Sequence, residues 1–271
     1  MAIGMIFVDI RLPHSPGKGE VFKMANWSDP RPTAATMPGT RVGARDAAYD
    51  AGLRSYMLSV YNYMASGVLL TGIVALLFSR GGIESPAATI ILAGGPLAWI
   101  IMLSPLAFVF AMSFGINRMK TSTLQVLFWA FAVVMGLSLS TIFLRYTGVS
   151  IAQTFFATTA AFAGLSLWGY TTKKDLSGFG TFLVMGVVGL VVAMLLNLWL
   201  QSTGLQLVIS AIGVLIFAGL TAYDTQRIKT TYDYVAGTDM MGKAVIMGAL
   251  SLYLDFINMF TFLLQFMGSR D

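Results

Sequence analysis

Two aspartates, Asp224 and Asp255, stand inside long apolar stretches and are the residues best suited to chemistry. The other ten acidic residues lie in the first 50 residues, in short polar connections or at the last position. A carboxylate at the centre of a membrane helix costs about 2.5–3.5 kcal/mol to insert, which favours a functional role. Two carboxylates that meet in a low-dielectric interior tend to share a proton, so the pair predicts a pH-dependent switch. A second interpretation is open for Asp224, which can be an interfacial carboxylate or a partner of nearby Arg227.

The composition indicates that membrane helices carry these aspartates. The chain has 271 residues, of which 56% are hydrophobic and 11% charged, against about 25% charged in an average soluble domain. It has no cysteine and one histidine, His14, which excludes disulfides, thiolate or histidine metal clusters and a triad that needs a buried imidazole. The connections between apolar stretches leave no room for a soluble catalytic domain. We therefore expect no enzyme, no cofactor and no nucleic-acid partner.

The apolar stretches predict an all-α fold with seven transmembrane helices, because each approaches or exceeds the roughly 20 residues that cross a bilayer. Their predicted ranges are 56-79, 88-115, 124-144, 150-170, 179-201, 204-226 and 244-267. Small residues recur within them, for example Gly186 with Gly189, or Ala160, Ala163 and Gly164. We expect these small residues to permit close helix packing.

The last apolar stretch carries a polar stripe. Ser251, Asp255, Asn258 and Gln265 share one helical face, with Phe262 between the last two. Lipid cannot accommodate such a face, so the last helix is predicted to be central and wrapped by the other six. The alternative interpretation of the stripe is hydrogen bonding that holds helices together.

Basic residues predict the orientation, since Lys and Arg are retained on the cytoplasmic side. Fourteen of the seventeen lie on one set of alternate connections, which places the amino terminus in the cytoplasm and the carboxy terminus outside. Residues 1-50 hold five of the eight prolines and are predicted to be a disordered cytoplasmic tail before a membrane domain at 51-271. Residues 1-23 are interpreted as an extension ahead of an initiator at Met24.

Three motifs resemble the Bax inhibitor-1 family, in its bacterial inner-membrane branch. They are "WGYTTKKDLSGFG" at 168–180, "GLTAYDTQRIK" at 219–229 and "GALSLYLDFINMF" at 248–260. The resemblance implies a pH-sensitive calcium leak controlled by an aspartate pair that matches Asp224 and Asp255. It also implies an arginine, matched by Arg118, that latches the first aspartate in the closed state. Some members carry an acidic residue where this chain has Ala107, so this chain lacks that carboxylate.

Calcium prefers six to eight oxygen ligands, so Asp224 and Asp255 with hydroxyls and water predict only a weak, transient site. The main alternative is a non-conducting protein that modulates a membrane protease or another membrane partner. An intramembrane aspartyl protease is disfavoured because Asp255 lacks flanking glycines. A retinal protein is disfavoured because Lys243 precedes the last span.

Overall fold

The protein is all-helical in a computed structural model that describes residues 39–92 and 94–269. Seven of the described helices are long and apolar enough to cross a membrane, which confirms the predicted number of spans. The elements in chain order are α1 (Gly39–Phe78), η2 (Gly82–Glu84), η3 (Ala87–Leu92), α2 (Pro96–Gly115), α3 (Thr121–Leu139), α4 (Ile142–Arg145), α5 (Gly148–Thr171), α6 (Ser177–Leu200), α7 (Thr203–Val235) and α8 (Met240–Met267).

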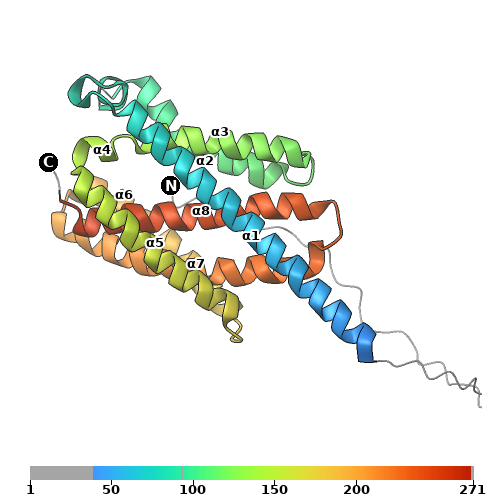
Figure 1. The fold of residues 1–271 in the computed structure, drawn as a ribbon. Helices are drawn as coiled ribbons and strands as arrows, with labels where there is room; N and C mark the ends of the chain where they lie inside the picture. The colour runs from blue at the N-terminus through green and yellow to red at the C-terminus, as the bar shows by residue number, and fades with distance from the viewer. Residues whose placement is uncertain (1–38, 93, 270–271) are drawn as a thin grey trace, which may run out of the picture.

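Helix α8 lies at the centre of the bundle, as the polar stripe predicts (Figure 1). In its most apolar 18-residue window, 94% of the residues are buried, against 22–39% in the other six spans. Helices α1, α3, α5 and α7 pack directly on α8, while α2 and α6 mainly cover α3 and α7 from outside. A helix that is buried all round in this way is shielded from lipid on its polar face.

Helix α1 begins at Gly39, within the range predicted to be a disordered tail. Residues 39–50 of the predicted tail are thus helical in the structure, and residues 1–38, including Met24, lie outside the described residues. Contacts to α7 hold the first turns of α1, because the Tyr49 hydroxyl donates a hydrogen bond to Asp233 and the Tyr49 ring packs edge-on against Tyr232. Asp233 is 184 residues away from Tyr49 in the sequence, so the composition of residues 39–50 does not reveal this contact.

The second span is shorter than the predicted 88-115. Residues 87–92 form a short π-helix, and Gly94 then adopts a left-handed φ of 73° before α2 starts at Pro96. Glycine tolerates this backbone conformation, and proline is well suited to the first helical position. The sequence "GGP" at 94–96 therefore separates two helical elements that hydropathy alone merges.

The sixth span is longer than the predicted 204-226, because α7 continues to Val235. Buried residues recur at helical spacing up to its end, including Ile228, Tyr232 and Val235. The Lys229 ammonium donates a 2.9 Å hydrogen bond to the Tyr170 carbonyl at the end of α5 and lies 4.8 Å from the Tyr170 ring centroid. Lys229 thus satisfies a carbonyl left free at a helix end.

Candidate functional site

Asp255 lies in the middle of α8 and has no exposed surface. Ser251 and Asn258, one turn to either side on the same face, are also buried. Among the residues that the structure describes, neither carboxylate oxygen of Asp255 has a hydrogen-bond partner. Buried polar atoms are nearly always hydrogen-bonded, so an unsatisfied carboxylate calls for an explanation.

Asp224 lies on α7 and is also buried, with 6% of its surface exposed. Two glycines of neighbouring helices lie close to the two residues that precede Asp224. A Cβ at Gly169 of α5 would lie 2.3 Å from the Ala222 carbonyl oxygen, and a Cβ at Gly180 of α6 would lie 2.3 Å from the Tyr223 ring. Both neighbouring helices therefore approach α7 closely within two residues of Asp224.

Asp224 and Asp255 lie on α7 and α8, the two helices with the most extensive contact among the described elements. Asp224 is near enough to Asp255 for the two carboxylates to interact electrostatically. Asp224 also interacts electrostatically with Arg227 on its own helix, which agrees with a partnership between them, whereas its burial argues against an exposed interfacial position. Two carboxylates from different helices thus face one low-dielectric region of the protein interior.

The oxygen ligands available for a cation at this pair are few. Within residues 39–92 and 94–269, no group of three or more His, Cys, Asp or Glu side chains is placed to hold a metal ion. The hydroxyls of the neighbouring Thr221 and Thr225 donate 2.8 Å hydrogen bonds to the backbone carbonyls of Phe217 and Thr221. The side chains that the structure describes here therefore do not form a full calcium cage, which needs six to eight oxygen ligands.

Arg118 lies in the turn that follows α2, and its side chain is exposed. In the part of the chain that the structure describes, it forms no hydrogen bond or ion pair with Asp224. The arginine whose charge acts on Asp224 here is Arg227. A latch role for Arg118 stays a prediction.

The side chains at the C-terminal end of the α8 stripe form hydrogen bonds, unlike Asp255. The Gln206 side-chain amide of α7 donates a 2.8 Å hydrogen bond to the Gln265 Oε1, which also accepts a 3.4 Å hydrogen bond from the Ser210 hydroxyl. Asn258 donates a 2.7 Å hydrogen bond to the Leu254 carbonyl of its own helix. The hydrogen-bonding interpretation of the stripe therefore holds for Gln265, and Asp255 differs from it by having no such partner among the described residues.

A network of hydroxyl groups that joins Tyr61, Ser166 and Thr225 was not predicted from the sequence. The Tyr61 hydroxyl of α1 lies 2.5 Å from the Ser166 hydroxyl of α5, which lies 2.8 Å from the Thr225 hydroxyl beside Asp224. The overlooked signal was a second polar stripe, in which Ser150, Thr154, Thr158 and Ser166 recur at multiples of four residues along α5 and are all buried. This network links α1, α5 and α7 next to the aspartate pair.

Comparison with known proteins places the chain in a family. The model of the family described as inhibitor of apoptosis-promoting Bax1 matches residues 53–271. An uncharacterized protein of Rickettsia prowazekii, RP147, is 46% identical over 84% of this chain and 94% of its own length. The inner membrane protein YbhL of Escherichia coli is 43% identical over 81% of this chain and 94% of its own length. An uncharacterized protein of Caulobacter vibrioides is 44% identical over 88% of this chain and 96% of its own length.

The match covers most of the first span, the other six spans in full and both buried aspartates, and the predicted resemblance is confirmed. The chain therefore belongs to the Bax inhibitor-1 family of multi-pass membrane proteins.

Proposed function

We propose that this protein is a pH-sensitive calcium or cation leak channel whose gate is the protonatable pair Asp224 and Asp255. The observation that carries the proposal is the burial of Asp255 without a hydrogen-bond partner among the described residues, beside the charge of Asp224. Ionisable groups inside a membrane are costly, and those that persist usually serve ion or proton movement. Gln265 supports this interpretation by contrast, because it shows how a polar side chain with a packing role is bonded in the same helix.

The proposed switch follows from the electrostatics of the pair. Two ionised carboxylates repel each other strongly in a low-dielectric interior, and a shared proton or a bound cation relieves the repulsion. Protonation keeps α7 and α8 together, whereas ionisation favours their separation or the entry of a cation. Arg118 competes for Asp224 in a latched state, and Arg227 is the cation that already acts on it. Calcium is the proposed permeant ion. Asp224 and Asp255 hold it only weakly, because they supply fewer than the six to eight oxygen ligands that calcium prefers.

The proposed location is the bacterial inner membrane, with the amino terminus in the cytoplasm and the carboxy terminus outside. The name of the Escherichia coli relative supports the compartment. The excess of Lys and Arg on alternate connections supports the orientation. We further propose that the protein has no enzymatic activity, because its family and its short connections offer no catalytic domain.

Calcium flux into liposomes as a function of pH tests the proposal. Asp255→Asn and Asp224→Asn keep the shape of the side chain but cannot ionise, so each should flatten the pH dependence of flux. The two substitutions should be strongly non-additive because they remove one shared switch. Asp239→Asn, at the exposed start of α8, is the matched control and should retain the wild-type profile.

Unchanged pH profiles in both Asn variants would rule out the gate. A complete lack of flux from folded wild-type protein would instead support the alternative function, a non-conducting protein that modulates a membrane protease or another membrane partner. Both outcomes require purified protein of verified helical content, so that loss of folding is not mistaken for loss of flux.

A further inference from the structure

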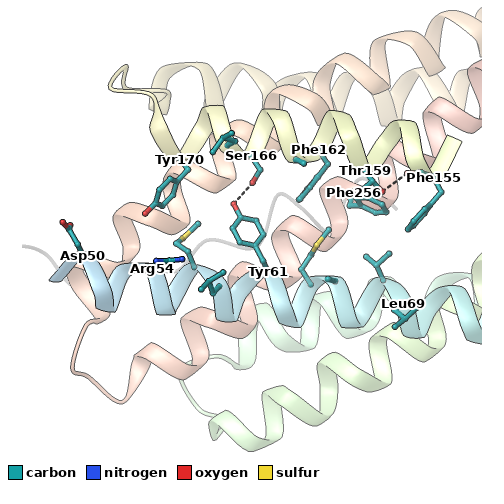
Figure 2. Close-up of a pocket in the computed structure, with 17 residues that line it drawn as sticks. Asp50, Arg54, Tyr61, Leu69, Phe155, Thr159, Phe162, Ser166, Tyr170 and Phe256 are labelled. Carbon is teal, nitrogen blue, oxygen red and sulfur yellow. Dashed lines mark hydrogen bonds between the residues drawn. The ribbon is translucent and has the colours of Figure 1, made fainter. Parts of the chain in front are cut away.

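A deep groove separates α1 from α5 on the side of the bundle that faces the membrane. Helix α1 packs mainly on α3 and α8, and α5 packs mainly on α7 and α8, which leaves a cavity of about 940 Å³ between them. Figure 2 shows this cavity with the Tyr61–Ser166 hydrogen bond crossing it. Phe256 of the central helix forms part of its lining. The volume lies near the upper end of the range of about 300–1,000 Å³ for small-molecule sites.

The groove continues along α1 into a second cavity of about 410 Å³. Val68, Phe155 and Phe256 line both cavities. The lining residues of α1 run from Asp50 to Leu76, which corresponds to about 39 Å at the helical rise of 1.5 Å per residue. The hydrocarbon core of a bilayer is about 30 Å thick, so the groove is long enough to run alongside lipid tails across the membrane.

The lining is apolar in the middle and charged at one end. Long flexible or aromatic side chains, such as Met57, Met64 and Phe162, line the interior. The charged lining residues are Asp50 and Arg54, which are exposed and lie one helical turn apart on α1. In the described range they form no ion pair with each other, and Figure 2 shows both at the same end of the cavity.

A further cation lies behind this end of the groove. The Lys229 ammonium lies 4.8 Å from the ring of Tyr170, which is itself a lining residue. This end of the groove thus carries the Asp50 carboxylate at its edge, and the positive charges of Arg54 and Lys229 lie deeper in. The excess of Lys and Arg predicts that this end faces the cytoplasm.

We infer that the α1–α5 groove binds a phospholipid of the adjacent leaflet with a zwitterionic phosphoethanolamine headgroup. An acyl chain fills the apolar cavity, the phosphate contacts Arg54, and the ammonium contacts Asp50. A lipid with a purely anionic headgroup would satisfy Arg54 but would face repulsion from Asp50. A helix of another protein is the less favoured occupant, since the opposite charges of Asp50 and Arg54 at one end match a zwitterionic headgroup and most of the lining side chains are large and apolar.

Photocrosslinking tests the inference. The wild-type protein is placed in phosphatidylcholine nanodiscs that contain a small fraction of phosphatidylethanolamine with a photoreactive acyl chain. Labelled peptides should map to the facing sides of α1 and α5. Unlabelled phosphatidylethanolamine should compete more effectively than phosphatidylglycerol or phosphatidylcholine.

Two alanines on α5 provide a matched pair of variants. Ala163 lines the cavity, and Ala161 is exposed on the same helix outside it. Ala163→Phe should reduce the labelling by obstructing the groove, whereas Ala161→Phe should leave it unchanged. Because both positions are exposed, neither substitution disturbs the protein core.

The headgroup assignment has its own variants. Arg54→Gln should weaken labelling about fivefold, the effect of one basic residue near a membrane surface. Asp50→Asn should bring competition by phosphatidylglycerol up to that by phosphatidylethanolamine. Labelling that is as strong in Ala163→Phe as in Ala161→Phe would overturn the inference. Equal competition by phosphatidylethanolamine and phosphatidylglycerol in the wild type, or crosslinks from the groove to a second protein chain, would also overturn it.

Discussion

A methyl group added at Gly169 is expected to destabilise the bundle at the contact between α5 and α7. A Cβ at this position would lie 2.3 Å from the Ala222 carbonyl oxygen and 2.9 Å from the Ala222 carbonyl carbon and Cα. Ordinary contact begins at 3.4 Å, so α5 must move away by about 1 Å. The obstacle is the backbone of α7, which has no alternative rotamer to adopt.

The expected loss can be estimated from the contacts involved. Overpacking in a close-packed interior costs about 1–3 kcal/mol. The shift also strains the hydrogen bond between Ser166 and Thr225, which has a length of 2.8 Å and lies one turn from Gly169. An interhelical hydrogen bond in a membrane contributes about 0.6 kcal/mol on average, which brings the loss to about 1.6–3.6 kcal/mol. Alanine regains about 0.5–1 kcal/mol through its better helix propensity, so Gly169→Ala should lower the free energy of unfolding by about 1–3 kcal/mol.

Gly164 on the same helix provides the matched control, because a Cβ added there meets no atom within 4 Å. Gly164→Ala should raise the free energy of unfolding by up to about 1 kcal/mol, since alanine loses less backbone freedom on helix formation. Equilibrium unfolding in mixed micelles, followed by circular dichroism, measures both changes. If the two variants shift the free energy in the same direction, the proposed close contact of α5 with α7 is refuted.

Three further expectations concern α8 and its ends. Asp255→Leu should leave the free energy of unfolding unchanged or raise it, because it removes a buried carboxylate without a described partner. A clear loss of thermal stability in detergent would contradict this and would indicate a hydrogen bond to Asp255. A double-mutant cycle of Gln206→Ala and Gln265→Ala should give a coupling of about 0.6 kcal/mol and no more than about 1.7 kcal/mol; zero coupling in equilibrium unfolding would contradict the bond between them. A reporter fused after Arg270 should be active only outside the cytoplasm, and cytoplasmic activity would contradict the predicted orientation.

The central position of α8 could be predicted because it depends on a cost that each residue carries by itself. Asp255 and Asn258 are unfavourable in lipid wherever they occur, so their shared face must meet protein. The same argument identified Asp224 and Asp255 as the two intramembrane carboxylates, and both are buried. It did not require knowledge of which helix packs against α8.

The positions of close helix contact could not be predicted, because they depend on which neighbour each residue meets. Gly186 and Gly189 were expected at tight contacts, yet an added Cβ at Gly189 meets nothing within 4 Å, and at Gly186 it meets only the end of the Ile216 side chain at 3.0 Å. Contacts with the backbone of another helix occur instead at Gly169, within a segment recognised only for its motif, and at Gly136, where an added Cβ would lie 2.7 Å from the Thr71 carbonyl oxygen. Small size permits close approach, whereas the packing partner decides whether it happens.

The aspartate pair is held by surroundings of different rigidity on its two sides. On α7, Gly169 lies against the Ala222 backbone and Gly180 against the Tyr223 ring, and both contacts would resist a displacement of α7. On α8, Phe256 follows Asp255 directly and lines the groove between α1 and α5, where its ring packs edge-on against Phe155 and Phe162 at 5.6 Å. A movement that parts the carboxylates therefore meets less resistance from the groove than from the α5–α7 contact. The proposed gate and the proposed lipid site therefore meet at adjacent residues of α8, and we expect the membrane to influence the pair from the side of the groove.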